Sequence, residues 1–418
     1  MKKVLSLILC LVLVLSLAAC GGTESTVNQN QDGSGTQSGD AGNASNSSDS
    51  TQAGDSQSGD GSTSNSTQGG NSVTGTQAQP VDGTALYQRV LAALGNPTVS
   101  TQTGSAKDYN SHVVTLADSG VLMRYIGIKA LKSGEEVNIM QATDFHFNKM
   151  NERDNTEQNP AVMDTRKNRK AYSDEATVPN VKKVLELGKK LDAVAITGDI
   201  MDYLTWGSLD LVKTHIWDVL GDKALAVLGG HDTTRVMQGT VGDSTTAQSR
   251  YDIIQSYWKH DVSYSNKIVK DRVMMVNIDN GASKYYGDQA KKLAADIKYA
   301  RENNLVILIF QHEPLATKNA AYGKTYPLTG SSKTVNFYKN CIGGSKYSAD
   351  AVTKEVLELI TKNADVIRGV FCGHLHDGYY VEIDATYEKN GETVKTSIPQ
   401  IVLGSSADYR CITVINVE

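Results

Sequence analysis

The sequence has few cysteines, and their spacing excludes two kinds of site. Five occur in 418 residues, and no two of them form a CxxC pair. Cys10 lies in an apolar leader and Cys20 at its end, which leaves Cys341, Cys372 and Cys411 for the rest of the chain. Three unevenly spaced thiols form neither a zinc cluster nor a disulfide framework. We expect three buried thiols, with a single disulfide among them as the alternative, because the leader implies export.

Two further absences narrow the class of function. The formal net charge is −5, with 41 basic and 46 acidic side chains, and this balance gives no signature of nucleic-acid binding. It also gives no general attraction for phosphate esters, so any affinity for anions must come from a metal or from a few local side chains. The HExxH pattern of zinc-binding metallopeptidase helices is absent. No segment of the sequence indicates a protein partner.

The first segment has the pattern of an export signal. Two lysines precede an apolar run from Val4 to Leu17, which is short for a membrane-spanning helix. The run closes at 17–21 on the sequence LAACG, which resembles the lipobox of bacterial lipoproteins. The resemblance implies a signal peptide at 1–19, acylation of Cys20, and a lipid anchor on the extracytoplasmic face of the bacterial cell membrane. The alternative is an ordinary signal peptide with an incidental cysteine.

The composition divides the rest of the chain. Residues 20–80 are rich in Gly, Ser, Thr and Asn and contain no aromatic residue, which predicts a disordered linker with a reach of about 40–45 Å. Residues 81–135 contain a short amphipathic helix and a strand, and we expect them to form an extension packed on the main domain. The main domain then extends over 136–418.

Strands and helices alternate in the main domain. Apolar runs at 137–142, 193–197, 224–228, 306–310 and 366–372 predict buried strands with helices between them. This alternation predicts a largely parallel sheet covered by helices, with ligands bound beyond the carboxyl ends of its strands. Three short strands are expected at 379–383, 398–403 and 411–417. They suggest a second, mixed sheet.

Each of the five apolar runs is followed by histidine or aspartate. These residues are Asp144 and His146, Asp199 and Asp202, His231 and Asp232, His312, and His374 and His376. Five of the eight histidines of the chain lie in these short phrases, which core packing would not require. The pattern predicts a metal site assembled across a whole sheet.

In order, the phrases DFH, GDIMD, GGHD, QHEP and GHLH resemble the motifs of the calcineurin-like metallophosphoesterases, over about 137–418. The resemblance implies a four-layer α/β/β/α sandwich with two mixed β-sheets and a two-metal centre at the sheet edges. It implies hydrolysis of phosphomonoesters or phosphodiesters by metal-bound hydroxide. Oxygen and imidazole ligands suit Mn, Fe or Zn alike.

The resemblance also assigns roles to residues. Asp199 would bridge two ions. The remaining ligands would be Asp144, His146 and His376 for one ion, and His312 and His374 for the other. His231 would face the substrate and stabilise or protonate the leaving oxygen, with Asp232 orienting its ring. Asp202 would support the site through hydrogen bonds, and Arg235 is a candidate contact for the substrate phosphate.

One position departs from the family pattern. The third motif usually contains an asparagine whose oxygen binds the second ion, and Gly230 stands in its place. We therefore predict a weaker second metal site, or one completed by Asp243 or Asn280. The alternative function is that of a catalytically impaired relative that binds phosphorylated ligands or cell-wall polymers.

Overall fold

The computed structural model describes residues 83–418, except 107–111, 155–172, 234–246 and 318–340. These residues belong to one compact unit of the chain. The predicted signal peptide, Cys20 and the predicted linker lie outside them. No helix in the described ranges combines the length and the apolar character that a membrane span requires.

The first sheet has seven strands and is mixed. Their spatial order is β1 (Val99–Thr103), β2 (Val113–Leu116), β3 (Val121–Ile128), β13 (Cys411–Val417), β4 (Val137–Ala142), β5 (Ala193–Thr197) and β6 (Ala224–Val227). Strands β4, β5 and β6 are parallel to one another, whereas β13 is antiparallel to β4 and parallel to β3. The last strand of the chain therefore lies in the middle of the first sheet.

The second sheet has six strands and is also mixed. Their order is β11 (Tyr379–Lys389), β12 (Glu392–Val402), β10 (Ile367–Cys372), β9 (Val306–Phe310), β8 (Val273–Ile278) and β7 (Tyr264–Val269). The four inner strands are parallel, and each edge strand pairs antiparallel with its neighbour. Strands β8 and β9 are buried at every residue, as expected for parallel strands that are covered on both faces.

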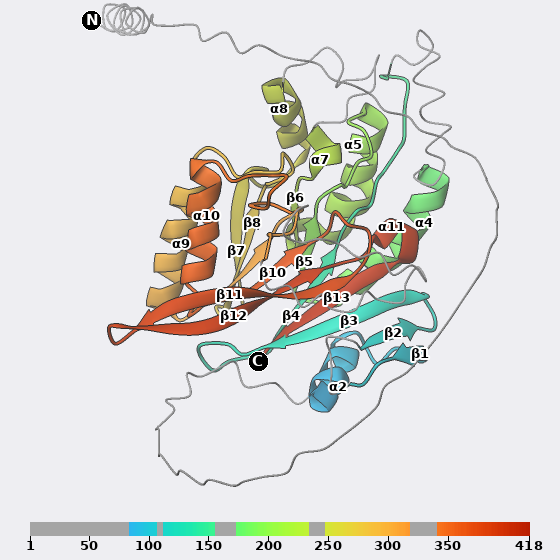
Figure 1. Cartoon of the computed structure of the whole chain (residues 1–418). Helices are drawn as coiled ribbons and strands as arrows, with labels where there is room; N and C mark the ends of the chain where they lie inside the picture. Colours follow the sequence, from blue (N-terminus) through green and yellow to red (C-terminus); the bar gives the residue numbers. More distant parts are fainter. Residues whose placement is uncertain (1–82, 107–111, 155–172, 234–246, 318–340) are drawn as a thin grey trace, which may run out of the picture. The chain divides into compact units, whose positions relative to one another are not determined.

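Three apolar cores hold the layers together. The middle core lies between the sheets, where the rings of Phe310 and Phe371 stack with centroids 5.2 Å apart. The outer core of the first sheet includes buried side chains of α2 (Gly83–Ala93), α4 (Asp174–Gly188), α5 (Trp206–Val212) and α8 (Ala247–Tyr257). The outer core of the second sheet includes buried side chains of α9 (Gln289–Asn303) and α10 (Ala351–Lys362), which lie side by side in Figure 1.

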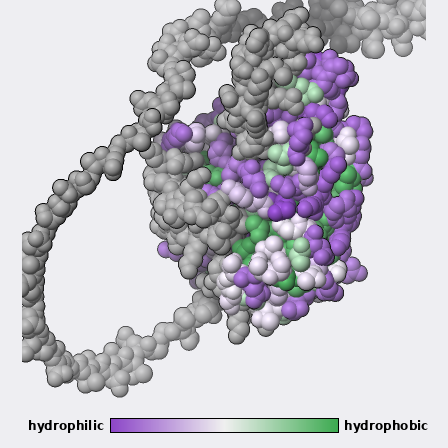
Figure 2. All heavy atoms as spheres, turned by 90° about the vertical axis from the view of Figure 1, so that its right-hand side faces the viewer, coloured by the Kyte–Doolittle hydropathy of each residue, from purple (hydrophilic) through white to green (hydrophobic). Residues whose placement is uncertain are grey.

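The predicted four-layer α/β/β/α sandwich with two mixed sheets is thus confirmed. Short helical segments complete the described structure: η2 (Lys213–Trp217), α6 (Asp218–Leu220), η3 (Gly221–Lys223), α7 (Gly230–Thr233) and α11 (Ser406–Tyr409). Figure 2 shows one face of the molecule, on which hydrophilic side chains dominate and hydrophobic ones form small patches. The helices accordingly turn their polar sides to solvent.

The end of the chain differs from the prediction of three short strands in one further sheet. Strands β11 and β12 are each eleven residues long and form a hairpin that closes at Asn390 and Gly391, both with positive φ. The outer half of the hairpin is mostly polar and largely exposed, so the apolar pattern underestimated the length of these strands. Strand β13 leaves this sheet and joins the first one.

Residues 99–128 supply three strands of the first sheet. Strand β3 pairs with β13 along the whole length of β13, from Leu122 with Cys411 to Ile128 with Val417. The backbone of β3 therefore continues the same hydrogen-bonded sheet as β4 and β5.

The position of β13 leads to a stability prediction. Ile415 is fully buried between the two sheets, so truncating its side chain would leave a cavity. We expect Ile415→Ala to lower the free energy of unfolding by about 2–5 kcal/mol, measured by urea denaturation. Ile268→Ala is the matched control, because Ile268 is 39% exposed and its loss should change stability by no more than about 0.5 kcal/mol. Equal effects of the two substitutions would contradict the central position of β13.

Candidate metal centre

The six predicted metal ligands follow the carboxyl ends of four strands. They are Asp144 and His146 after β4, Asp199 after β5, His312 after β9, and His374 and His376 after β10. Backbone hydrogen bonds join these strand ends: Asp144 N donates to Gly198 O over 3.0 Å, and Gly373 N donates to His312 O over 2.9 Å. Both sheets therefore contribute to one site.

The backbone is strained at five of these six residues. Positive φ angles occur at Asp144 (53°), His146 (47°), Asp199 (48°), His374 (74°) and His376 (60°). A residue with a Cβ atom pays about 1–2 kcal/mol for this left-handed conformation. Such strain is typical of functional sites, where the surrounding structure enforces it. It turns the chain sharply after each strand and directs the side chains toward one another.

Three glycines make room for this packing. A Cβ atom at Gly198, whose φ is 86°, would lie 2.6 Å from Nδ1 of His312. One at Gly229 would lie 2.3 Å from Oδ1 of Asp199, and one at Gly373 would lie 2.5 Å from Oδ2 of Asp144. The glycines of the motifs are therefore required by the close approach of the ligand side chains.

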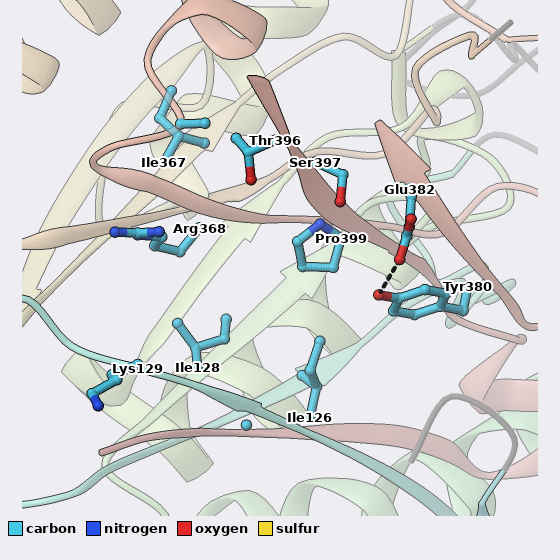
Figure 3. Close-up of a pocket in the computed structure, with 12 residues that line it drawn as sticks. Ile126, Ile128, Lys129, Ile367, Arg368, Tyr380, Glu382, Thr396, Ser397 and Pro399 are labelled. Atoms are coloured by element: carbon cyan, nitrogen blue, oxygen red, sulfur yellow. Dashed lines mark hydrogen bonds between the residues drawn. The ribbon is translucent and has the colours of Figure 1, made fainter. Parts of the chain in front are cut away.

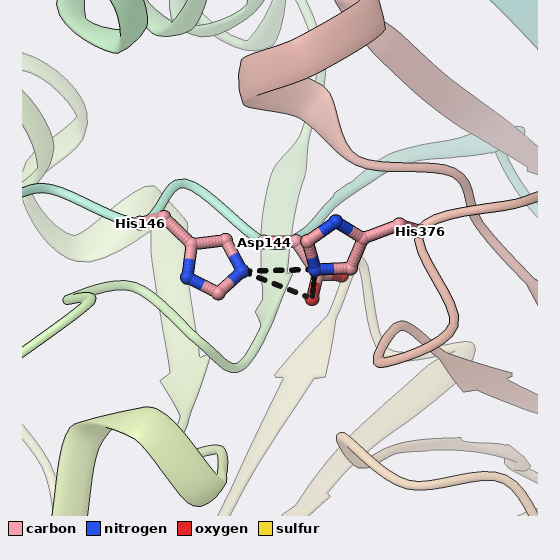
Figure 4. A group of neighbouring side chains, drawn as sticks. All are labelled: Asp144, His146 and His376. Carbon is pink, nitrogen blue, oxygen red and sulfur yellow. Dashed lines mark hydrogen bonds and ion pairs between the residues drawn. The ribbon is translucent and has the colours of Figure 1, made fainter. Parts of the chain in front are cut away.

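The first group of candidate ligands is Asp144, His146 and His376 (Figure 4). The two Nε2 atoms lie 3.0 Å apart. Oδ1 of Asp144 lies 3.4 Å from Nε2 of His376 and 3.7 Å from Nε2 of His146. This oxygen is buried and accepts no hydrogen bond from any described residue. Two imidazole nitrogens and one unsatisfied carboxylate oxygen around a single point fit a divalent metal ion.

The second group is Asp199, His312 and His374. Oδ2 of Asp199 lies 3.2 Å from Nε2 of His312, which in turn lies 3.3 Å from Nδ1 of His374. The same Oδ2 lies 3.9 Å from Nε2 of His146 in the first group. Asp199 therefore stands between the two groups, in the arrangement that the family resemblance implied.

Hydrogen bonds from outside the two groups orient the imidazoles. Nδ1 of His312 lies 2.8 Å from the carbonyl oxygen of Thr197, and Nδ1 of His376 lies 3.3 Å from Oδ2 of Asp408. These partners occupy Nδ1 and leave Nε2 available for an ion. Asp408 lies on α11, 32 residues after His376, and no motif around it indicates this role.

Charges in the site favour a cation. Burial raises the pKa of Asp144, but the facing imidazoles of His376 and His146 outweigh burial and hold this pKa well below its usual value. Burial lowers the pKa of His312 and of His376, yet the carboxylates of Asp199 and Asp144 raise both pKa values to about 10. Burial and the neighbouring His312 lower the pKa of His374 to about 4. The imidazoles and the buried carboxylates thus stabilise each other's charged forms.

The prediction that Asp232 orients His231 is wrong, and Asp202 has that position. Nδ1 of His231 lies 2.9 Å from Oδ1 of Asp202. The carboxylate of Asp232 instead accepts backbone hydrogen bonds from Ile200, Met201 and Gly229. Asp232 therefore connects the turn after β5 to the turn after β6 through hydrogen bonds.

Asp202 supports the site through hydrogen bonds, as predicted. Its Oδ1 also lies 3.4 Å from Nδ1 of His146, and its Oδ2 accepts a hydrogen bond from Asn148 over 3.4 Å.

Burial and the charge of Asp199 raise the pKa of Asp232 to about 7, which sets it apart from the low pKa values of Asp144 and Asp199.

The structure locates only some of the remaining candidates. Arg235 and Asp243 lie in 234–246, outside the described residues. Oδ1 of Asn280 accepts hydrogen bonds from the backbone nitrogens of His312 (3.1 Å) and Glu313 (2.9 Å), so both of its lone pairs are engaged. Asn280 thus fixes the end of β9 and does not complete the second group.

Gly230 places no side chain toward the second group, as the sequence indicated. A Cβ atom added there would lie 3.2 Å from the carbonyl oxygen of Gly281, a tight contact. The predicted weakness of the second metal site stays a prediction. Cys341, Cys372 and Cys411 are buried free thiols, as expected, and do not form a disulfide with one another.

Comparisons with known proteins give weak likenesses. No family model matches the sequence, and no curated protein matches it. Among solved structures, the chain is similar to a dimetal phosphatase from Danio rerio, with 10% identity, a TM-score of 0.35, and coverage of 65% of this chain and 88% of that one. It is also similar to a putative 5'-nucleotidase from Staphylococcus aureus in complex with alpha-ketoglutarate, with 10% identity and a TM-score of 0.31. This match covers 64% of this chain and 54% of that one. At these values the likenesses carry no inference about activity.

Metal binding should release protons. Because the pKa values of His312 and His376 are about 10, both imidazoles are charged at pH 7 in the metal-free protein, and each must lose a proton to bind an ion. Affinity for Mn²⁺ should therefore rise with pH from 6 toward 10. Isothermal titration calorimetry at pH 7 in buffers of different ionisation enthalpy measures the number of protons released. Zero release, or proton uptake, would contradict the charge state described above.

The two groups should lose different ions when they are mutated. His374 contributes to the second group and His376 to the first, although the residues are separated by only one position. We expect each alanine substitution to remove about one ion per chain from the dialysed protein, and the double substitution to remove both. Elemental analysis measures the number of metal ions per chain. His215→Ala, outside both groups, should retain the wild-type content. Loss of one common ion in both single variants would show that the two groups form a single site.

Proposed function

We propose that this chain is a metal-dependent phosphoester hydrolase. The observation that carries the proposal is the position of Asp199, whose Oδ2 lies 3.2 Å from Nε2 of His312 and 3.9 Å from Nε2 of His146. One carboxylate thus adjoins two groups of ligands, which is the arrangement that a pair of ions requires. Two bound ions would supply a Lewis acid for the phosphoryl oxygens and lower the pKa of a water molecule.

The chain supplies a ligand set for such ions without any thiolate. Carboxylate and imidazole ligands suit Mn, Fe or Zn. Asp144, His146 and His376 would hold one ion. His312 and His374 would hold the other, and Asp199 would contact both. The strained backbone and the glycines fix these side chains before any ion arrives, so little reorganisation accompanies binding.

His231 is the candidate for proton transfer to the leaving oxygen. Its side chain is 17% exposed, whereas the side chains of His146 and His312 are 1% and 0% exposed. Asp202 contacts Nδ1 and orients the ring, so that Nε2 is the nitrogen available to donate a proton to a bound substrate. The backbone nitrogen of His231 also donates to Oδ1 of Asp199 over 2.9 Å. One residue therefore orients the shared carboxylate and presents the proton donor.

Metal-dependent turnover tests this function. We expect the full chain to hydrolyse bis-p-nitrophenyl phosphate or p-nitrophenyl phosphate when Mn²⁺ is present, to stop when the metal is chelated, and to recover when Mn²⁺ is restored. His231→Ala should lower kcat by about 10²–10⁴-fold, because it removes the proton donor. Its metal content is measured alongside, because His231 also forms a group of possible ligands with His146 and Asp199. His260→Ala, a histidine outside the site, should retain wild-type turnover.

A second candidate function is that of a binding protein for phosphorylated ligands or cell-wall polymers. Gly230 favours it, because the place of the expected amide ligand has no side chain. The assay above separates the two candidates. The binding protein would be favoured if the wild-type chain binds phosphate esters in the presence of Mn²⁺ but hydrolyses them no faster than His231→Ala does. A panel of nucleotides, glycerophosphodiesters, phospholipid head groups and wall polymers would then identify the substrate or the ligand.

We further propose that the protein is a bacterial lipoprotein, with its catalytic domain outside the cytoplasm. The LAACG sequence at 17–21 and the polar segment at 20–80 support this placement. We expect mass spectrometry of the mature protein to find an N-terminal peptide that begins at acylated Cys20. Cys20→Ser should transfer the domain from the membrane fraction to the soluble fraction. A mature N-terminus elsewhere, without acyl chains, would contradict the anchor.

A further inference from the structure

A cavity away from the metal centre is lined by residues of both sheets (Figure 3). Its volume is about 230 Å³, and β3, β10, β11 and β12 line it. Arg368, at the start of β10, lines the cavity, whereas His374 and His376 follow the end of the same strand. At about 3.3 Å per residue, the two sites are about 20 Å apart along β10. The cavity is thus separate from the proposed hydrolytic site.

A β-bulge directs Arg368 into this cavity. The register between β10 and β9 shifts between Ile367 and Gly369, so Arg368 is an extra residue in the strand. Phe371 faces the other sheet and Val370 faces the helices, and regular alternation would turn Arg368 toward the helices as well. Ile367 is buried in the same core as Val370 and also borders the cavity. The bulge thereby frees Arg368 from the regular alternation and lets it line the cavity as well.

One donor of Arg368 has no acceptor in the described part of the protein. Its Nε atom is buried and donates no hydrogen bond to any described residue. Asp365 attracts Arg368 through space, but both oxygens of Asp365 are bound by Arg301, at 2.6 and 2.9 Å. A buried donor without an acceptor costs about 1–3 kcal/mol, so the Nε–H of Arg368 is a place where a bound acceptor would add stability.

The lining divides the cavity into two charged ends and an apolar middle. Figure 3 shows Arg368 and Lys129 on one side and Glu382 on the other, where its Oε1 accepts a hydrogen bond from the hydroxyl of Tyr380 over 3.5 Å. Ile126, Ile128 and Pro399 lie between the two ends. Because β10, β12 and β11 are neighbours, Arg368 and Glu382 are two strand spacings apart, about 10 Å.

We propose that this cavity binds a small aliphatic carboxylate. The carboxylate would be held by the guanidinium of Arg368 and by Lys129, since the fork of an arginine matches a carboxylate in two-point contact. The hydrocarbon body would cover Ile128 and Pro399. Glu382 repels a second negative charge at the far end, so the site selects monoanions over dicarboxylates. The volume corresponds to roughly eight water molecules, which suits a ligand of about eight heavy atoms.

The experiment uses the full chain in the presence of a chelator, so that no anion can bind through a metal. Hexanoate, 6-aminohexanoate and adipate share a six-carbon chain and differ at the far end. We expect calorimetry to detect binding of hexanoate and 6-aminohexanoate, and to find adipate weaker by about tenfold or more. Arg368→Met should weaken hexanoate binding by about tenfold or more, since it removes a charge-assisted contact. It should also raise Tm without ligand, because the buried Nε–H donor without an acceptor is gone.

Three further variants complete the test. Glu382→Gln should narrow the difference between adipate and hexanoate. Lys129→Met removes the second cation from an exposed position and should weaken hexanoate binding even if Arg368→Met does not fold. Lys354→Met, on α10 and outside the cavity, should bind as wild type. The proposal would be overturned if the Arg368 and Lys129 variants bind hexanoate as the wild type does. It would also be overturned if the wild type binds adipate as tightly as hexanoate, or inorganic phosphate as tightly as hexanoate.

Discussion

The structure depends on the burial of two carboxylates beside four imidazoles at one edge of the sandwich. Buried carboxylates repel each other and lose hydration, so they are stable only where positive charge meets them. Asp144 and Asp199 are 0% and 3% exposed, and the pKa values of the facing His312 and His376 are raised to about 10 in response. The left-handed backbone at five of the six ligands and the close approach permitted by the three glycines place these charges together. A pair of metal ions would supply the same positive charge.

Elements distant in sequence hold this arrangement. Oγ of Ser405 donates to the carbonyl oxygen of Asp144 over 3.1 Å, and Oγ of Ser406 accepts from the backbone nitrogen of Thr143 over 3.0 Å. Both serines precede β13, whose insertion between β3 and β4 brings this segment beside the first group of ligands. Asp408 in the same segment contacts His376. The final part of the chain thus supports the fold and orients a metal ligand.

Strand β10 connects two sites of different chemistry. Its carboxyl end continues into His374 and His376, and a bulge at its beginning directs Arg368 between the sheets. The first site gathers carboxylates that need cations, and the second presents a cation that lacks a carboxylate. At each place one buried polar atom, Oδ1 of Asp144 or Nε of Arg368, has no hydrogen-bond partner among the described groups, which is the physical reason to expect ligands at both ends.

The sequence by itself determined the strands that carry the site and the identity of the candidate ligands. Buried parallel strands are short apolar runs, and β4, β5 and β9 begin and end where those runs do. Tertiary structure alone decided the rest. The apolar pattern reports burial but not pairing, so it missed the exposed half of the β11–β12 hairpin and the insertion of β13. The GGHD phrase suggested that Asp232 orients its neighbour His231, yet three backbone nitrogens hold Asp232, and Asp202 approaches the imidazole across the fold. Hydrogen-bond partners are chosen by proximity in space, and a motif specifies only proximity along the chain.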